Sequence, residues 1–180
     1  MVFICLRNTI FTAYLGLNMT IHKLYIDEFD EDEYDLIAIH TSLEDYRLAY
    51  FINQTLPVLL HKNKNEIQIN LKEAETHFSR FTFENNDKEI SWNLIQNKNE
   101  ISLPHKEKAR NLFDISNTSL EVATKVYLLP EFKKVDYFLK IENSQQSPET
   151  IANNINTIDR ISAVYSVDTR TIKSKNNLIF

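Results

Sequence analysis

The stretch that decides the fold is residues 135–168, VDYFLKIENSQQSPETIANNINTIDRISAVYSVD. Apolar side chains alternate with others over Val135–Glu142 and again over Ile161–Asp168, and such alternation predicts strands. The residues expected to face the core are Val135, Tyr137, Leu139 and Ile141 in the first strand and Ile161, Ala163, Tyr165 and Val167 in the second. The side chains expected on the opposite face of the first strand are Asp136, Phe138 and Lys140.

A helix is expected between these two strands. Ser147-Pro148-Glu149 is typical of a helix start, because proline fits the first helical position and an acidic side chain is favourable in the first turn. Ile151, Ile155 and Ile158 then recur at helical spacing and mark one buried face. The whole stretch therefore predicts a strand, a helix and a second strand.

A second unit of the same kind is expected over residues 34–61. Strands are predicted at Tyr34–His40 and Val58–His61, and a helix at Leu43–Thr55 that Pro57 ends. Thr41 and Ser42 supply hydroxyls for the helix start, with Glu44 at capping-box spacing from Thr41. The buried stripe predicted for this helix consists of Leu43, Tyr46 and Tyr50.

Shorter strands are expected in the rest of the chain. They are predicted at Ile21–Ile26, Glu66–Leu71, Phe78–Glu84, Glu89–Ile95 and Glu121–Leu129. The polar residues Asn85–Lys88 separate two of these strands, which is typical of a hairpin. Lys98–Thr118 contains Pro104 and several charges, and it is interpreted as a long surface loop near residues 98–118.

These elements predict an α+β fold. We expect an antiparallel or mixed sheet with two helices on one face, built around two βαβ-like units. A ferredoxin-like or a split βαβ arrangement accommodates both units. Residues 19–180 are expected to form one domain of this kind.

Residues 1–18, MVFICLRNTIFTAYLGLN, differ from the rest of the chain. Arg7 interrupts the apolar run, no positive charge precedes it, and no small-residue cleavage site follows. The preferred interpretation is a mis-assigned start, with Met19 as the initiator, and a leader or anchor is the alternative. The segment is too short and too interrupted to span a bilayer, so no membrane association is expected.

Composition excludes several classes of chemistry. Gly16 is the only glycine, so the chain cannot contain a P-loop, a Gly-rich dinucleotide fingerprint or a G-x-S-x-G nucleophile elbow. Cys5 is the only cysteine, which excludes an internal disulfide and a cysteine-based metal site and fits a cytoplasmic location. The net charge of −5 disfavours a nucleic-acid binder, and no DNA partner is expected.

One short motif carries a family resemblance. Residues 129–137 read LPEFKKVDY, in which Pro130, Glu131, Val135, Asp136 and Tyr137 match the signature of the IPExxxVDY family of uncharacterised bacterial proteins. The chain also resembles that family at residues 21–24, 39–46 and 173–180, so the resemblance covers nearly all of 19–180. It implies a bacterial protein, and it brings no catalytic residue with it.

The two carboxylates of the motif have two interpretations. Glu131 and Asp136 are expected near one end of the sheet, where a pair of carboxylates could bind a hard cation or act as general acid and base. The preferred interpretation is structural: Glu131 offsets a lysine, and Asp136 accepts hydrogen bonds from a neighbouring loop or helix start.

Other candidate sites also have structural interpretations that we prefer. The acidic run at residues 27–35 lacks the glycine and the terminal glutamate register of a calcium loop, and it is interpreted as a solvated connector. The five histidines show no metal-ligand spacing. His40 lies near Ser42 and Asp45, but without an oxyanion loop it is expected to bond locally.

Structural interpretations are also preferred for the strand aromatics and for the apolar residues 178–180. Strand aromatics that could stack RNA bases are Phe81, Phe83, Trp92 and Tyr127. Their period of two favours a place in the core. Leu178-Ile179-Phe180 is expected to dock on the domain itself.

The function predicted from these observations is a non-catalytic cytoplasmic binding module that acts through a protein partner. We assign no catalytic residue, no metal ligand and no cofactor, and we place a possible interaction site at the five matching motif residues. The alternatives are a metal-dependent hydrolase or phosphoesterase that uses Glu131, Asp136 and acids of the 27–35 run, and an RNA-associated domain.

Overall fold

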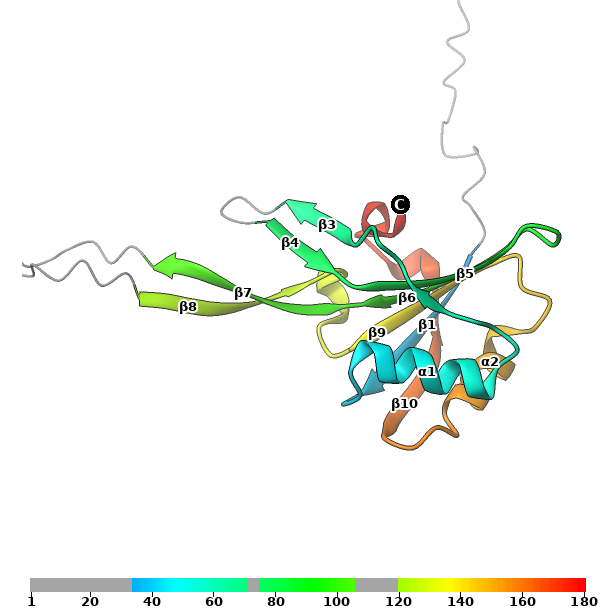
Figure 1. The fold of residues 1–180 in the computed structure, drawn as a ribbon. Helices are drawn as coiled ribbons and strands as arrows, with labels where there is room; N and C mark the ends of the chain where they lie inside the picture. Colours follow the sequence, from blue (N-terminus) through cyan, green and yellow to red (C-terminus); the bar gives the residue numbers. More distant parts are fainter. Residues whose placement is uncertain (1–33, 71–74, 106–119) are drawn as a thin grey trace, which may run out of the picture. The chain divides into compact units, whose positions relative to one another are not determined.

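Both helices of the described residues pack on one face of a six-stranded sheet in the computed structural model, which describes residues 34–70, 75–105 and 120–180 (Figure 1). The strands of the sheet are β1 (Tyr34–Thr41), β2 (His61–Lys62), β5 (Arg80–Asn85), β6 (Ile90–Gln96), β9 (Tyr137–Glu142) and β10 (Ile161–Val167). The helices are α1 (Asp45–Thr55) and α2 (Pro148–Ile155). Two separate ribbons are formed by β3 (Ile67–Asn70) with β4 (Glu75–Phe78) and by β7 (Lys98–His105) with β8 (Leu120–Tyr127). Short 3-10 turns are η2 (Pro130–Phe132), η3 (Thr169–Thr171) and η4 (Lys175–Leu178).

The strand order confirms the predicted fold class. The sheet runs β10-β1-β9-β6-β5-β2, and every neighbouring pair is antiparallel. Strands β9 and β10 are joined through α2 and lie on either side of β1. This arrangement is a split βαβ unit. The elements β1, α1, β6, β9, α2 and β10 together have the strand order of a ferredoxin-like fold.

The second predicted unit differs from a compact βαβ. Strand β2 begins only at His61, so the expected strand over Val58–His61 is largely absent. It lies at the far edge of the sheet, separated from β1 by β9, β6 and β5.

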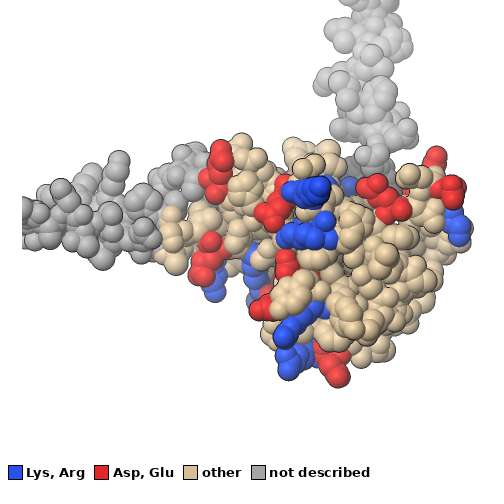
Figure 2. Space-filling view, in the orientation of Figure 1, with Lys and Arg blue, Asp and Glu red and all other residues tan. Residues whose placement is uncertain are grey.

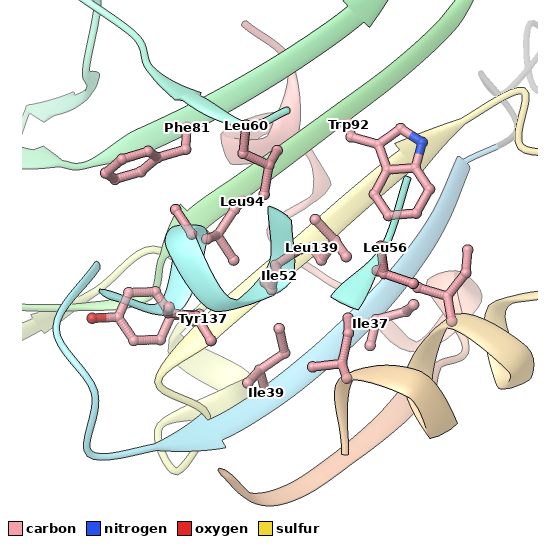
Figure 3. Packing of buried hydrophobic residues seen from close by; sticks show 14 of the residues in the cluster. Ile37, Ile39, Ile52, Leu56, Leu60, Phe81, Trp92, Leu94, Tyr137 and Leu139 are labelled. Atoms are coloured by element: carbon pink, nitrogen blue, oxygen red, sulfur yellow. The ribbon is translucent and has the colours of Figure 1, made fainter. Parts of the chain in front are cut away.

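The helix-side core lies between the sheet and the two helices (Figure 3). Its labelled members are Ile37, Ile39, Ile52, Leu56, Leu60, Phe81, Trp92, Leu94, Tyr137 and Leu139. Helix α2 contributes Ile151, Ile155 and the following Ile158, the three isoleucines that were predicted. Its start is also as predicted, since the Ser147 side chain accepts a hydrogen bond from Thr150 N.

The opposite face of the sheet forms a second core. Phe138 is fully buried there, and Lys140 is 7% exposed, so β9 is covered on both faces. The cover includes Ile172 and Leu178, so the docking predicted for residues 178–180 is confirmed for Leu178. The Phe180 ring lies beside Arg80, whereas Ile179 is 75% exposed and does not dock. Val135 belongs to this second core and does not share the face of Tyr137.

Helix α1 buries a different stripe from the one predicted: of Leu43, Tyr46 and Tyr50, only Leu43, which precedes the helix, is buried. Tyr46 and Tyr50 are 55% and 57% exposed, whereas Leu48 and Ile52 are fully buried. The aliphatic side chains are favoured inside because a buried tyrosine hydroxyl needs a hydrogen-bond partner. The predicted capping box is also absent: Glu44 is the N-cap without a side-chain cap bond, and the Thr41 hydroxyl accepts from Leu43 N.

Strand β10 does not present one uniform face. The register with β1 shifts between His40 and Thr41, which leaves Ser162 as an extra residue. A bulge of this kind reverses the side-chain alternation. Ile161 and Val164 therefore contact the helix-side core, and Val167 contacts the second core.

The prediction of a long surface loop near residues 98–118 is wrong for the first part of that stretch. Lys98–His105 form β7, which pairs with β8 in register from Lys98 opposite Tyr127 to His105 opposite Leu120. Pro104 is tolerated because β7 belongs to a two-stranded ribbon and not to the middle of a sheet. Residues 106–119 lie outside the described residues.

Several expectations fall on residues that the structure does not describe. The start or leader at 1–18, the strand at Ile21–Ile26 and all but the end of the acidic run at 27–35 are among them. The described residues belong to one compact unit, Asp32–Phe180. None of the described helices combines the length and the apolar character needed to cross a bilayer.

A single buried side chain, Asn97, connects the end of β6 to the segment between β8 and β9. Asn97 is 0% exposed, and its Nδ2 donates to Phe132 O and to Val135 O, each at 2.9 Å. Its Oδ1 accepts from Leu129 N at 2.9 Å. Three backbone groups of the motif segment are thus paired by one amide.

We expect Asn97→Ala to lower the free energy of unfolding by about 2–3 kcal/mol, because it leaves Leu129 N and Val135 O without these partners, while Phe132 O keeps its hydrogen bond from Val135 N. Urea unfolding of both proteins measures the difference. The matched control is Asn93→Ala, since Asn93 is also buried but its side chain donates to Ser91 Oγ alone among the described residues. A loss of about 1 kcal/mol is expected for the control. Equal losses for the two variants would contradict the role given to Asn97.

Candidate functional site

The predicted motif forms a tight connection between β8 and β9. Pro130 occupies the first turn of η2, and Phe132 N donates to Leu129 O at 2.9 Å. Val135 N then donates to Phe132 O at 3.0 Å, which closes the next turn. Leu129 and Val135 are buried at 0% and 1% exposure, so the segment is anchored by an apolar side chain at each end.

Glu131 fastens the segment that follows β10. Its Oε1 accepts hydrogen bonds from Lys173 N at 2.8 Å and from Ser174 N at 2.9 Å. Its Oε2 accepts from the Ser174 hydroxyl at 3.1 Å. Burial opposes ionisation of Glu131, yet these hydrogen bonds outweigh it and lower the pKa of the carboxyl. We expected Glu131 to balance the charge of a lysine side chain. It binds the backbone amides of Lys173 and Ser174 instead.

Asp136 joins three parts of the chain. Its Oδ2 accepts from Thr41 N at 3.0 Å, where β1 ends and the chain turns toward α1. Its Oδ1 is 2.6 Å from the Lys98 ammonium, and that ammonium also donates to Lys134 O. The backbone of Asp136 pairs with Ile39 O and Asn97 N. These contacts are those of the structural interpretation, in which Asp136 accepts from a neighbouring loop.

Tyr137 reaches from β9 to the start of α1. Its ring lies in the helix-side core, and its hydroxyl donates to Leu43 O at 3.1 Å (Figure 3). Burial raises the pKa of Tyr137 to about 12, helped by the negative charges of Asp45, Asp136 and Glu44. The phenol thus stays protonated and acts as a hydrogen-bond donor.

The two motif carboxylates do not form a paired site. Glu131 binds residues 173–174, whereas Asp136 binds Thr41 and Lys98, so the two share no partner. In the part of the chain that the structure describes, no three His, Cys, Asp or Glu side chains lie close enough to hold a metal ion. The interaction role assigned to the five motif residues stays a prediction, and their observed contacts are all internal.

The other candidates from the sequence also have internal contacts. His40 Nε2 is 3.3 Å from the Tyr165 hydroxyl, and the two rings are stacked with centroids 5.6 Å apart. Asp45 instead bonds Tyr46 N and pairs with Lys62. Phe81 and Trp92 are buried beneath the helices, which confirms the core interpretation of these two aromatics.

A polar pocket of about 380 Å³ lies over β5, β6 and β9. Arg80, Lys140, Glu142 and the Phe180 ring line it, together with Glu84 and Glu89. The Lys140 ammonium is already bound by Glu142 at 2.7 Å and by Leu178 O at 3.1 Å. Burial lowers the pKa of Arg80, whose guanidinium lies 4.4 Å from the centre of the Phe180 ring. Because both signs of charge line the pocket, it does not select a ligand of one charge.

The outer face of α1 carries a set of side chains that we call the tyrosine stripe: Tyr46, Arg47 and Tyr50. The Arg47 guanidinium lies 6.0 Å from the centre of the Tyr46 ring, and a hydrogen bond with Glu44 raises the pKa of Tyr46. The Tyr50 hydroxyl accepts from Gln54 Nε2 at 2.7 Å, and its ring packs edge-on against Phe51. Both rings are therefore held in place while more than half exposed. The helical spacing of these tyrosines was visible in the sequence, but it was interpreted as a buried stripe.

Charged side chains of both signs are interspersed on the visible face of the molecule, with no extended area of positive charge (Figure 2). Nucleic-acid binders of this size normally gather lysine and arginine on one face. The visible face shows no such gathering of lysine and arginine (Figure 2).

We expect Tyr137→Phe to cost about 1 kcal/mol of stability at neutral pH, because Leu43 O loses its donor. The folded state keeps the Tyr137 proton at higher pH than the unfolded chain does, so this tyrosine makes the wild type less stable as the pH rises from 10 toward 12. Tyr137→Phe cannot lose stability in this way. The difference in the free energy of unfolding between the wild type and the variant should therefore narrow over this interval. Urea unfolding at neutral pH and in steps above pH 10 measures both effects. A difference in stability between wild type and variant that stays constant over this interval would contradict the assignment.

We expect Glu131→Ala to release the segment around residues 172–178 from the second core, with a loss of about 1–2 kcal/mol. Amide hydrogen exchange should become faster at Lys173 and Ser174, whose N–H groups lose their acceptor. Because the pKa of Glu131 is lowered in the fold, its contribution should be present near neutral pH and disappear as the carboxyl is protonated in acid. Unchanged exchange at both amides would refute this anchoring role.

Comparison of the chain with protein-family models, with curated proteins and with solved structures gave no match. The resemblance to the IPExxxVDY family therefore stays a prediction.

Proposed function

We propose that this protein is a non-catalytic binding module that acts through a protein partner, and that the partner contacts the tyrosine stripe of α1. The observation that carries the proposal is the exposure of Tyr46 and Tyr50, at 55% and 57%, one helical turn apart on the same helix face. Exposed aromatic rings that lie together on one helix face are typical of surfaces that contact another protein.

The composition of the stripe fits a protein surface as its ligand. Tyrosine and arginine are enriched among the residues that carry most of the binding energy in protein interfaces. Tyrosine loses little conformational entropy on binding, and the contacts with Gln54 and Arg47 reduce that loss further. Glu44 lies 3.8 Å from the Arg47 guanidinium and Asp45 lies 3.5 Å from the Lys62 ammonium, so the charges beside the stripe are balanced and we assign no charge to the partner.

The internal contacts of the motif favour this function over a metal-dependent hydrolase. Glu131 and Asp136 each hold protein donors on separate segments, and this use of their oxygens supports a structural role. The burial of Phe81 and Trp92 likewise favours a protein partner over stacked RNA bases. The single cysteine supports a cytoplasmic location. We assign no cofactor.

The test is affinity capture from a lysate of the source organism with the tagged full chain as bait. The variant is Tyr46→Gln with Tyr50→Gln, because glutamine keeps a high helix propensity and removes both rings. We expect a stoichiometric protein with the wild type and at least a tenfold loss with the variant, since each interface tyrosine commonly contributes more than about 1 kcal/mol.

The matched control is Leu59→Gln, which removes an exposed apolar side chain, 70% accessible, outside α1. Capture should be unchanged in this control, and thermal unfolding should show that all three proteins are folded. Equal capture by the double variant would place the partner elsewhere. A turnover that depends on Glu131 or Asp136 would refute the non-catalytic assignment.

A further inference from the structure

The face of the sheet opposite the helices changes from apolar to polar along its strands. At one end, Phe138 of β9 belongs to the second core. The register of β6 with β9 then places Asn93 beside Lys140 and, two residues further along, Ser91 beside Glu142. The polar pocket of about 380 Å³ lies over this second end. The pocket is therefore built on a rigid sheet.

Arg80 is the cation of this pocket whose charge the described residues leave unpaired. It forms no ion pair with them, and its Nε is buried without a hydrogen-bond partner. Burial lowers the pKa of Arg80, as expected for a cation that loses water without gaining a partner. Its guanidinium lies over the Phe180 ring, and a guanidinium in contact with a ring still has N–H donors along its edges. Arg80 can therefore bind a carboxylate bidentately.

Two carboxylates of the pocket also lack an ion-pair partner among the described residues, those of Glu84 and Glu89. Glu84 follows Arg80 by four residues in β5, so the two side chains share a face of the sheet. The Glu89 carbonyl accepts from Asn143 Nδ2 at 2.9 Å, which fixes the hairpin turn at the rim of the pocket. The pocket thus holds one unpaired cation and two unpaired anions.

We propose that this pocket binds a free α-amino acid. The ligand carboxylate accepts hydrogen bonds from Arg80, and the ligand ammonium is bound by Glu84 and Glu89. A simple anion such as phosphate is disfavoured by the glutamates, and a simple cation leaves Arg80 unpaired. A ligand that carries both charges on neighbouring atoms satisfies both sets of groups.

The volume and the lining of the pocket narrow the ligand further. Small-molecule pockets have volumes of about 300–1,000 Å³, so this one fits a small ligand. The sheet supplies Ser91 and Asn93, whose side chains are joined by a hydrogen bond of 3.0 Å. The Lys140 ammonium beside them is already paired with Glu142. This part of the pocket offers hydrogen bonds without an unpaired charge, so we expect an uncharged polar side chain on the ligand.

This inference goes beyond the proposed function and uses the other face of the sheet. The tyrosine stripe belongs to α1, which packs on the helix-side face. Ligand binding and partner capture therefore fail separately.

The first test is thermal unfolding of the full chain with each of the standard amino acids and with inorganic phosphate. A ligand that binds the folded state raises the unfolding midpoint. We expect the uncharged polar amino acids to raise it and phosphate not to. An absence of any shift with amino acids, or a larger shift with phosphate, would overturn the inference. Shifts with charged or apolar amino acids alone would overturn the side-chain assignment.

The second test is calorimetric titration with the amino acid that gives the largest shift and with two of its analogues. One analogue has an amide in place of the carboxylate, and the other lacks the amino group. Arg80→Gln should weaken binding of the amino acid at least about tenfold and remove its advantage over the amide. Glu84→Gln should remove its advantage over the analogue without the amino group.

Two control variants should bind the amino acid like the wild type. Lys88→Gln changes the same hairpin turn at a residue that does not line the pocket. Tyr46→Gln with Tyr50→Gln changes the tyrosine stripe alone. Glu84 is exposed, so its variant keeps the test valid if Arg80→Gln fails to fold. Variants of the pocket that weaken all three ligands equally would overturn the inference, because binding would then not depend on the two charged groups.

Discussion

The buried amide of Asn97 is the constraint on which the connection between β8 and β9 depends. This connection places the backbone of Leu129, Phe132 and Val135 where water cannot reach all of its polar groups, and one side chain pairs all three residues. The backbone of Asn97 adds bonds to Leu128 and Asp136. Because buried polar groups are costly without partners, the path of the segment is fixed once Asn97 is enclosed. Glu131, Asp136 and Tyr137 then project toward three distant parts of the chain.

This arrangement explains why the most distinctive motif of the sequence does not form a reactive site. Glu131 holds residues 173–174, Asp136 holds the end of β1, and Tyr137 holds the start of α1. Their polar atoms are used in joining elements that are remote in sequence. Exposed aromatic side chains are found instead on the outer face of α1, and among the described residues β10 has a strand partner on one side only. Both consist of ordinary residues whose significance depends on their exposure.

The elements that were predicted correctly have local causes. Helix α2 has a serine cap, a proline in its first turn and isoleucines at helical spacing, so its position and buried face follow from the twelve residues 147–158. The errors occur where two local patterns compete or where a partner is distant. Tyr46 and Tyr50 compete with Leu48 and Ile52 for the buried side of α1, and the spacing of residues does not choose between them. Lys98–His105 became a strand because β8 pairs with it across residues 106–119.

The sequence by itself determined the α+β class, the strand–helix–strand unit around α2 and the absence of glycine-dependent phosphate sites. Periodicity, caps and composition decide these properties, and each acts over a few residues. Only the tertiary structure decided that β9 is covered on both faces, that Ser162 forms a bulge and that Asn97 pairs three backbone groups. These features depend on contacts between residues about 30 to 120 positions apart, which no local pattern encodes. For the same reason, the exposure of the tyrosine stripe became visible only in the folded chain.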